Sequence, residues 1–60
     1  MVGKNVKFWF LNEKRSTIVK SGTILDKIIQ KSNTAYIIQY KDDGVYILRI
    51  VKPDQIIGII

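Results

Sequence analysis

Residues 34–50 constrain the fold of this chain more than any other segment. Two runs of mainly β-branched and aromatic residues flank the short turn Asp42-Asp43-Gly44, and this arrangement predicts a β-hairpin. We take the turn as three residues long, with Gly44 in the left-handed conformation, so that the strands pair through a G1 bulge. Tyr40 then lies opposite Tyr46, and this pairing fixes the register of the whole hairpin.

The predicted register sorts the hairpin side chains into two faces. One face is uniformly apolar or aromatic and consists of Tyr36, Ile38, Tyr40, Tyr46, Leu48 and Ile50. The other face is mixed and consists of Ile37, Gln39, Lys41, Val45, Ile47 and Arg49. A two-residue turn would shift the pairing by one residue and place Gln39 opposite Leu48, which mixes the faces. The pattern therefore favours the three-residue turn.

The rest of the chain also predicts strands. Residues 6–11 alternate in polarity with a period of two, residues 23–31 form a second run, and residues 56–60 form a short last strand. Isoleucine spacing at 24–31 is also compatible with a helix, but β-branching favours a strand, with a register shift near Asp26. Gly22 predicts a bend or bulge. Residues 12–17 predict a loop, 32–33 a tight turn, and Pro53 a single 3₁₀ turn.

Size and composition limit how this chain can be stabilised. We expect one domain spanning residues 1–60, and a chain without cysteine or histidine has no disulfide and no ordinary structural zinc site. Twelve isoleucines supply the apolar packing instead, at about 1.5–3 kcal/mol for each fully buried side chain. No apolar run approaches the ~20 residues that span a bilayer, and no signal peptide is evident. We expect a soluble cytoplasmic protein without membrane contact.

The order of strands and loops resembles the SH3-like small barrel. Five short strands, a polar loop after the first, tight turns in the middle and a one-turn break before the fifth carry the resemblance, which covers nearly the whole chain. It implies an all-β, five-stranded antiparallel barrel whose closure removes most sheet edges. The expected core consists of Phe8, Phe10, Ile24, Tyr36, Ile38, Leu48, Ile50 and an isoleucine of the last strand.

Members of the SH3-like group differ in what they bind, and three of them are relevant to this sequence. The loop Glu13-Lys14-Arg15 is basic where peptide-binding SH3 domains carry an acidic loop, and their aromatic-rich first-strand motif is missing. In proportions and charge the chain is similar to the DNA-binding barrel at the C-terminus of retroviral integrases. The segment Lys20-Ser21-Gly22-Thr23-Ile24 resembles the glycine-centred strand start of KOW-type and Tudor-like barrels. These resemblances concern the fold and transfer no function residue by residue.

Charge favours an anionic partner. Ten lysines and arginines against five acidic residues give a net charge of +5, so we expect DNA or RNA binding through phosphates; charge for solubility alone is the simpler explanation. Trp9 is expected to point outward beside Lys7 as a base-stacking ring, or else to pack beneath the following loop. The predicted nucleic-acid site consists of Lys7, Trp9, Lys14, Arg15, Lys20, Lys27 and Lys31.

The sequence offers little for catalysis. Without histidine or cysteine its serines and threonines lack the usual activating base, and no glycine-rich phosphate loop is present. Asp26 is the one acid among apolar neighbours. We therefore expect neither enzymatic activity nor a cofactor or metal.

The mixed hairpin face offers an alternative function. Partly exposed apolar residues on it are typical of a contact surface for a protein partner or a second copy of the chain. The residues predicted for that interface are Ile37, Val45, Ile47 and Arg49.

Overall fold

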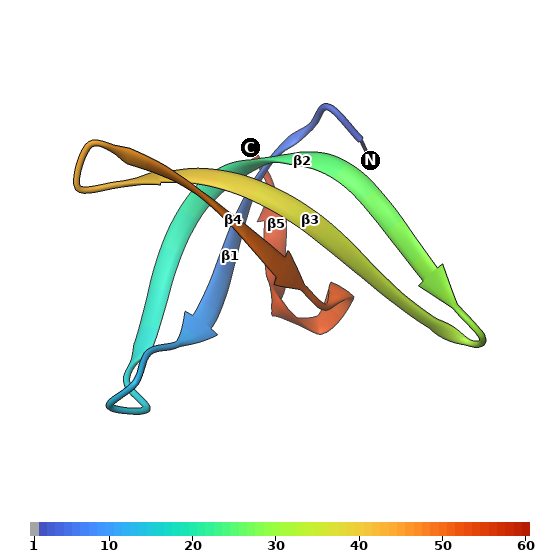
Figure 1. Ribbon diagram of the computed structural model, residues 1–60, viewed down its shortest axis with the longest axis horizontal. Coiled ribbons are helices and arrows are strands. Elements are labelled where there is room, and N and C mark those ends of the chain that lie inside the picture. The colour runs from blue at the N-terminus through green and yellow to red at the C-terminus, as the bar shows by residue number, and fades with distance from the viewer. Residues whose placement is uncertain (1) are drawn as a thin grey trace.

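Five antiparallel strands account for most of the computed structural model, which describes residues 2–60. They are β1 (Asn5–Leu11), β2 (Thr17–Gln30), β3 (Asn33–Asp42), β4 (Val45–Val51) and β5 (Ile56–Ile59), with the 3₁₀ turn η1 (Pro53–Gln55) before β5. They form one strongly curved sheet in the order β4-β3-β2-β1-β5 (Figure 1). Across the described residues, no ladder of hydrogen bonds joins the edge strands β4 and β5. The all-β prediction is confirmed, whereas closure into a barrel is not.

The long strand β2 belongs to two ladders in succession. Its first half pairs with β1, and this ladder runs from Thr17, opposite Leu11, to Thr23, opposite Asn5. Its second half pairs with β3 alone. The prediction of a strand at 24–31 is thus confirmed against the helical alternative, as is the register shift, which falls between Ile24 and Asp26. Asp26 itself is exposed.

Gly22 serves a purpose other than the predicted bend or bulge. The pairing of β2 continues through it without a shift. A Cβ atom at Gly22 would lie 2.6 Å from the carbonyl oxygen of Gln39 and 2.7 Å from Cγ2 of Ile38. Glycine at this position therefore permits the close approach of β3 to β2.

The predicted hairpin register is wrong by one residue. The turn contains only Asp43 and Gly44, with φ of +51° and +80°, so that Gln39 lies opposite Leu48 and Tyr40 opposite Ile47. Asp-Gly is a preferred pair for two-residue turns with positive φ at both positions, whose twist matches that of the strands. Turn chemistry therefore outweighs the sorting of faces on which the prediction depended.

The core lies on the inner face of the sheet, which we define as the face carrying Phe8. Its fully or nearly buried members are Val6, Phe8, Phe10, Ile24, Ile38, Tyr40 and Val51. Ile18, Tyr36, Ile47 and Ile56 pack against them. The ring centroids of Phe8 and Tyr40 are 5.4 Å apart, and those of Phe10 and Tyr40 are 5.8 Å apart.

The core prediction is correct except on β4. Leu48 and Ile50, expected inside, point to the outer face and are 62% and 65% exposed. The one-residue slip exchanges the two faces of β4, so that Val51 takes the buried place.

The chain reaches β5 by crossing from one edge of the sheet to the other. Pro53 opens η1, as predicted, and the side-chain Nε2 of Gln55 donates a hydrogen bond to the carbonyl oxygen of Trp9, at 3.0 Å. Ile56 then pairs with Phe8. None of residues 2–60 belongs to a helix that is long and apolar enough to cross a membrane.

Candidate interaction surfaces

Two residues of the predicted nucleic-acid site lie together on the outer face. On β1, Lys7 lies opposite Ser21 of β2 and Trp9 lies opposite Val19. Lys7 is exposed, whereas Trp9 is half-buried. Neither β1 nor the part of β2 paired with it contains an acidic residue. This part of the outer face therefore combines positive charge with a partly exposed aromatic ring.

The other predicted cations are dispersed. Lys14 and Arg15 lie in the turn between β1 and β2, while Lys31 lies in the turn between β2 and β3. These turns are at opposite ends of the molecule (Figure 1). Lys27 lies opposite Tyr36, on the half of β2 that extends beyond β1. The seven residues therefore do not form one continuous surface.

Lys20 faces away from Lys7 altogether. It lies opposite Phe8 on the inner face, and its Nζ is 3.2 Å from Oδ1 of Asp42, with side chains 33% and 46% exposed. This ion pair joins β2 to β3 two residues beyond the Gly22–Tyr40 pair. Exposed ion pairs of this kind contribute about 0–1 kcal/mol to the free energy of unfolding. The main effect of this ion pair is therefore to fix the position of the Asp42 side chain.

Two residues that the sequence prediction missed extend this positively charged part of the outer face. Lys41 lies opposite Tyr46, and its Nζ is 5.8 Å from the centroid of the Tyr46 ring. Ser21 and Lys41 both line a shallow groove of about 310 Å³ on this face. We call Lys7, Trp9, Lys41 and Tyr46 the lysine–aromatic platform. A hairpin register based on the two-residue turn Asp43-Gly44 would have placed Lys41 and Tyr46 opposite one another on the outer face.

The predicted protein interface is divided between the two faces. Ile37 points outward, whereas Ile47 and Arg49 point inward and Val45 lies at the turn end of β4 opposite Asp42. The outer face carries a different apolar group, in which Tyr46, Leu48 and Ile50 are 66%, 62% and 65% exposed. Together with Ile37, which lies opposite Ile50, these residues form what we call the outer strip.

Arg49 occupies an unusual environment. Its guanidinium carbon lies 3.9 Å from the centroid of the Phe10 ring. Its Nε atom is buried and, among the described residues, has no hydrogen-bond partner. The residue lines a pocket of about 680 Å³, the Arg49 pocket, whose lining consists of Phe10, Leu11, Asn12, Glu13, Lys14, Tyr40, Asp42, Ile47 and Arg49.

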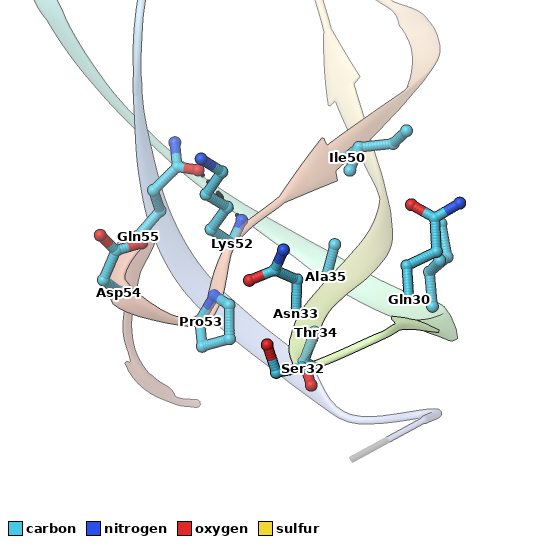
Figure 2. Close-up of a pocket in the computed structure, with 11 residues that line it drawn as sticks. Gln30, Ser32, Asn33, Thr34, Ala35, Ile50, Lys52, Pro53, Asp54 and Gln55 are labelled. Carbon is cyan, nitrogen blue, oxygen red and sulfur yellow. Dashed lines mark hydrogen bonds between the residues drawn. The ribbon is translucent and has the colours of Figure 1, made fainter.

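A second pocket of about 670 Å³ lies between the β2–β3 hairpin and η1. Figure 2 shows Lys52, Pro53 and Gln55 on one side of it, and Asn33 and Gln30 on the other. Its lining is largely amide, hydroxyl and aliphatic, and no buried polar side-chain atom there lacks a partner. The pocket thus offers less to a specific ligand than the Arg49 pocket does.

Comparisons with models of known protein families, with curated proteins and with solved structures give no match to this chain. Within residues 2–60, no three acidic side chains lie close enough together to hold a metal ion.

Proposed function

We propose that the sheet is an open barrel of the SH3-like class. Three features support this assignment: the strand order β4-β3-β2-β1-β5, the 3₁₀ turn between β4 and β5, and the return of β5 onto β1. In such an arrangement η1 crosses the open side, and β4 is left as an unpaired edge.

We further propose that the protein is an assembly module which forms a homodimer through β4. The observation that carries this proposal is the outer strip, where three successive outward side chains of an edge strand are each more than 60% exposed. Proteins normally protect such edges with charges, proline or short strands. The only charged residue of β4, Arg49, points to the inner face.

The sequence of β4 fits pairing with a second copy of itself. An antiparallel pair related by a two-fold axis and centred on Leu48 would place Tyr46 opposite the Ile50 of the other copy on the outer face. On the inner face it would place Ile47 opposite the other Arg49, so that the two guanidinium groups are not directly paired. Aromatic–aliphatic cross-strand pairs are favourable, whereas like charges directly opposite one another are not. The strand is therefore self-complementary in this register.

Sedimentation velocity tests the proposed dimer. We expect the wild-type protein to form a dimer and Leu48→Glu to be monomeric, because the substitution brings two carboxylates together at the two-fold axis. Ile29→Glu is the matched control, since Ile29 is similarly exposed, at 65% against 62% for Leu48, but lies on β2. A wild-type monomer at every soluble concentration, or equal dissociation of both variants, would overturn the proposal.

A second candidate function is weak binding of single-stranded nucleic acid on the lysine–aromatic platform. Two lysines and two aromatic rings on one face support it, as does the lack of acidic residues in β1 and in the part of β2 paired with it. Stacked bases would contact the rings and phosphates the lysines. Labelled single-stranded DNA and RNA, followed by anisotropy, test this candidate. Lys7→Glu is expected to weaken binding and Lys27→Glu, off the platform, to leave it nearly unchanged.

Salt separates the two functions. Binding of nucleic acid weakens as salt rises, because it releases counterions. The dimer is expected to tighten, because each copy carries a charge of +5 and salt screens the repulsion between them. A dimer that dissociates in salt would contradict an apolar interface.

A further inference from the structure

We propose that the Arg49 pocket binds a carboxylate group attached to an apolar body. The pocket lies on the inner side of the sheet, between the β1–β2 turn and the β3–β4 hairpin. It is separate from the outer strip and from the lysine–aromatic platform, and the proposal does not depend on either.

Arg49 supplies the group that would hold the carboxylate. The Phe10 ring covers the guanidinium on one side, with its centroid 3.9 Å from Cζ. The Nε atom, buried and without a partner among residues 2–60, leaves a donor unused. A guanidinium presents several N–H donors in a rigid planar fork, which matches the two oxygens of a carboxylate. The ring contact and the unused donor together support a cation that is held in place and not neutralised within the chain, as a site for a planar anion requires.

Lys20 keeps one of the two carboxylates that line the pocket occupied. Asp42 lines the same pocket as Arg49, and it would be the obvious partner for the guanidinium. Its Oδ1 atom instead lies 3.2 Å from Nζ of Lys20, and this is the only salt bridge among residues 2–60. Lys20 therefore acts as a positioning residue that keeps Asp42 from closing the site.

The walls of the pocket indicate the kind of carboxylate. Phe10, Leu11 and Ile47 provide apolar surface beside Arg49. Glu13 and Asp42 balance Lys14 and Arg49 in formal charge around the pocket. Such a site favours a singly charged anion over a phosphate dianion, because the two acids repel a second negative charge. A small free acid and the C-terminal carboxylate of a peptide share this chemistry.

Nuclear magnetic resonance of the ¹⁵N-labelled protein tests the proposal directly. The probes are N-acetyl-leucine, a short peptide that ends in leucine, and the C-terminal amide of each. We expect each acid to shift the Arg49 Nε–H signal saturably, and each amide to bind more weakly by roughly tenfold or more, because it lacks the charge-assisted fork. Tighter binding of the peptide acid would assign the source to a chain end, and tighter binding of the free acid to a small molecule. Equal shifts by acid and amide, or equally tight binding of inorganic phosphate, would overturn the proposal.

Two substitutions examine the roles of Arg49 and Lys20. Arg49→Lys keeps the charge but loses the fork, and we expect affinity for the acids to fall by roughly tenfold or more. Lys20→Met releases Asp42 to compete for Arg49, so it should also weaken binding, whereas Lys27→Met outside the pocket should not. Unchanged affinity in both Arg49→Lys and Lys20→Met would contradict the assignment. The comparison of acid with amide in the wild-type protein needs no substitution and stands even if a variant fails to fold.

Discussion

β1 and β4 have the same length, seven residues, but β1 buries more of its apolar side chains than β4 does. On β1, Val6, Phe8 and Phe10 are buried and Lys7 points to solvent. On β4 the charged Arg49 points inward, and Leu48 and Ile50 point outward. β1 lies between two neighbours, whereas β4 has one.

This contrast indicates that burial on β4 is incomplete within a single chain. A central strand satisfies its apolar face against the core and its backbone against two ladders. An edge strand with an apolar outer face has both an unpaired backbone and exposed side chains. A second copy of β4 would pair with this backbone and cover these side chains. The comparison therefore supports the proposed dimer.

Truncating one large side chain on each strand gives the largest expected difference. Phe8→Ala should lower the free energy of unfolding by about 3–5 kcal/mol, because a fully buried ring leaves a cavity. Leu48→Ala should change it by less than about 0.5 kcal/mol when measured at low protein concentration, where the monomer predominates. Urea denaturation provides both values. Equal losses for the two variants would show that β4 is buried in the monomer, contrary to the structure.

The close approach of β3 to β2 gives the next largest effect. Gly22→Ala introduces a Cβ atom 2.6 Å from the Gln39 carbonyl oxygen, so one strand must move, at a cost of about 1–3 kcal/mol. Gly58→Ala is the control, because no atom lies within 4 Å of its added Cβ. The measurement is again chemical denaturation. A stable Gly22→Ala variant would mean that the sheet yields there without strain.

The sequence predicted the register of a strand correctly where the two faces of that strand differ clearly in polarity. On β1, Val6, Phe8 and Phe10 alternate with Lys7, Trp9 and Leu11, so only one choice of face keeps the lysine out of the core, and those core positions are correct. On β3 and β4 both faces carry isoleucine, so polarity does not choose between registers, and the chemistry of Asp43-Gly44 decides. The predicted core at Leu48 and Ile50 failed for this reason.

Placement of the candidate site failed for a related reason. Lys27 and Lys31 were expected on the same surface as Lys7 on the condition that residues 23–31 pair antiparallel with residues 6–11. The sequence does not show where one ladder ends and the next begins, and β2 changes partner near Thr23. Lys20 was expected to extend the surface through the loop, but it belongs to the β1–β2 ladder, where it lies opposite Phe8 and therefore on the inner face. The Arg49 pocket is lined by residues of β1, β3, β4 and the β1–β2 turn, which are far apart in the sequence, so it has no local sequence signal.

Making β4 resemble β1 on its inner face should raise stability slightly. Arg49→Met removes a buried donor without a partner, which typically costs about 1–3 kcal/mol. It also removes the contact with the Phe10 ring, which contributes about 0.5–1 kcal/mol. We expect a net gain of about 1 kcal/mol in the free energy of unfolding. A loss of stability would mean that the guanidinium is already satisfied, and this result would weaken the case for a ligand.

The smallest expected effect concerns the ion pair that separates Asp42 from Arg49. Lys20→Met should change the free energy of unfolding by no more than about 1 kcal/mol, because both partners are partly exposed. In the same variant, the Arg49 Nε–H signal should shift, because Asp42 can then approach the guanidinium. The double variant Lys20→Met, Asp42→Asn is the control, since it removes the competing charge and should return the signal toward its wild-type position. A signal that is the same in all three proteins would show that Asp42 does not compete for Arg49. Lys20 would then have no role in keeping the guanidinium free for a ligand.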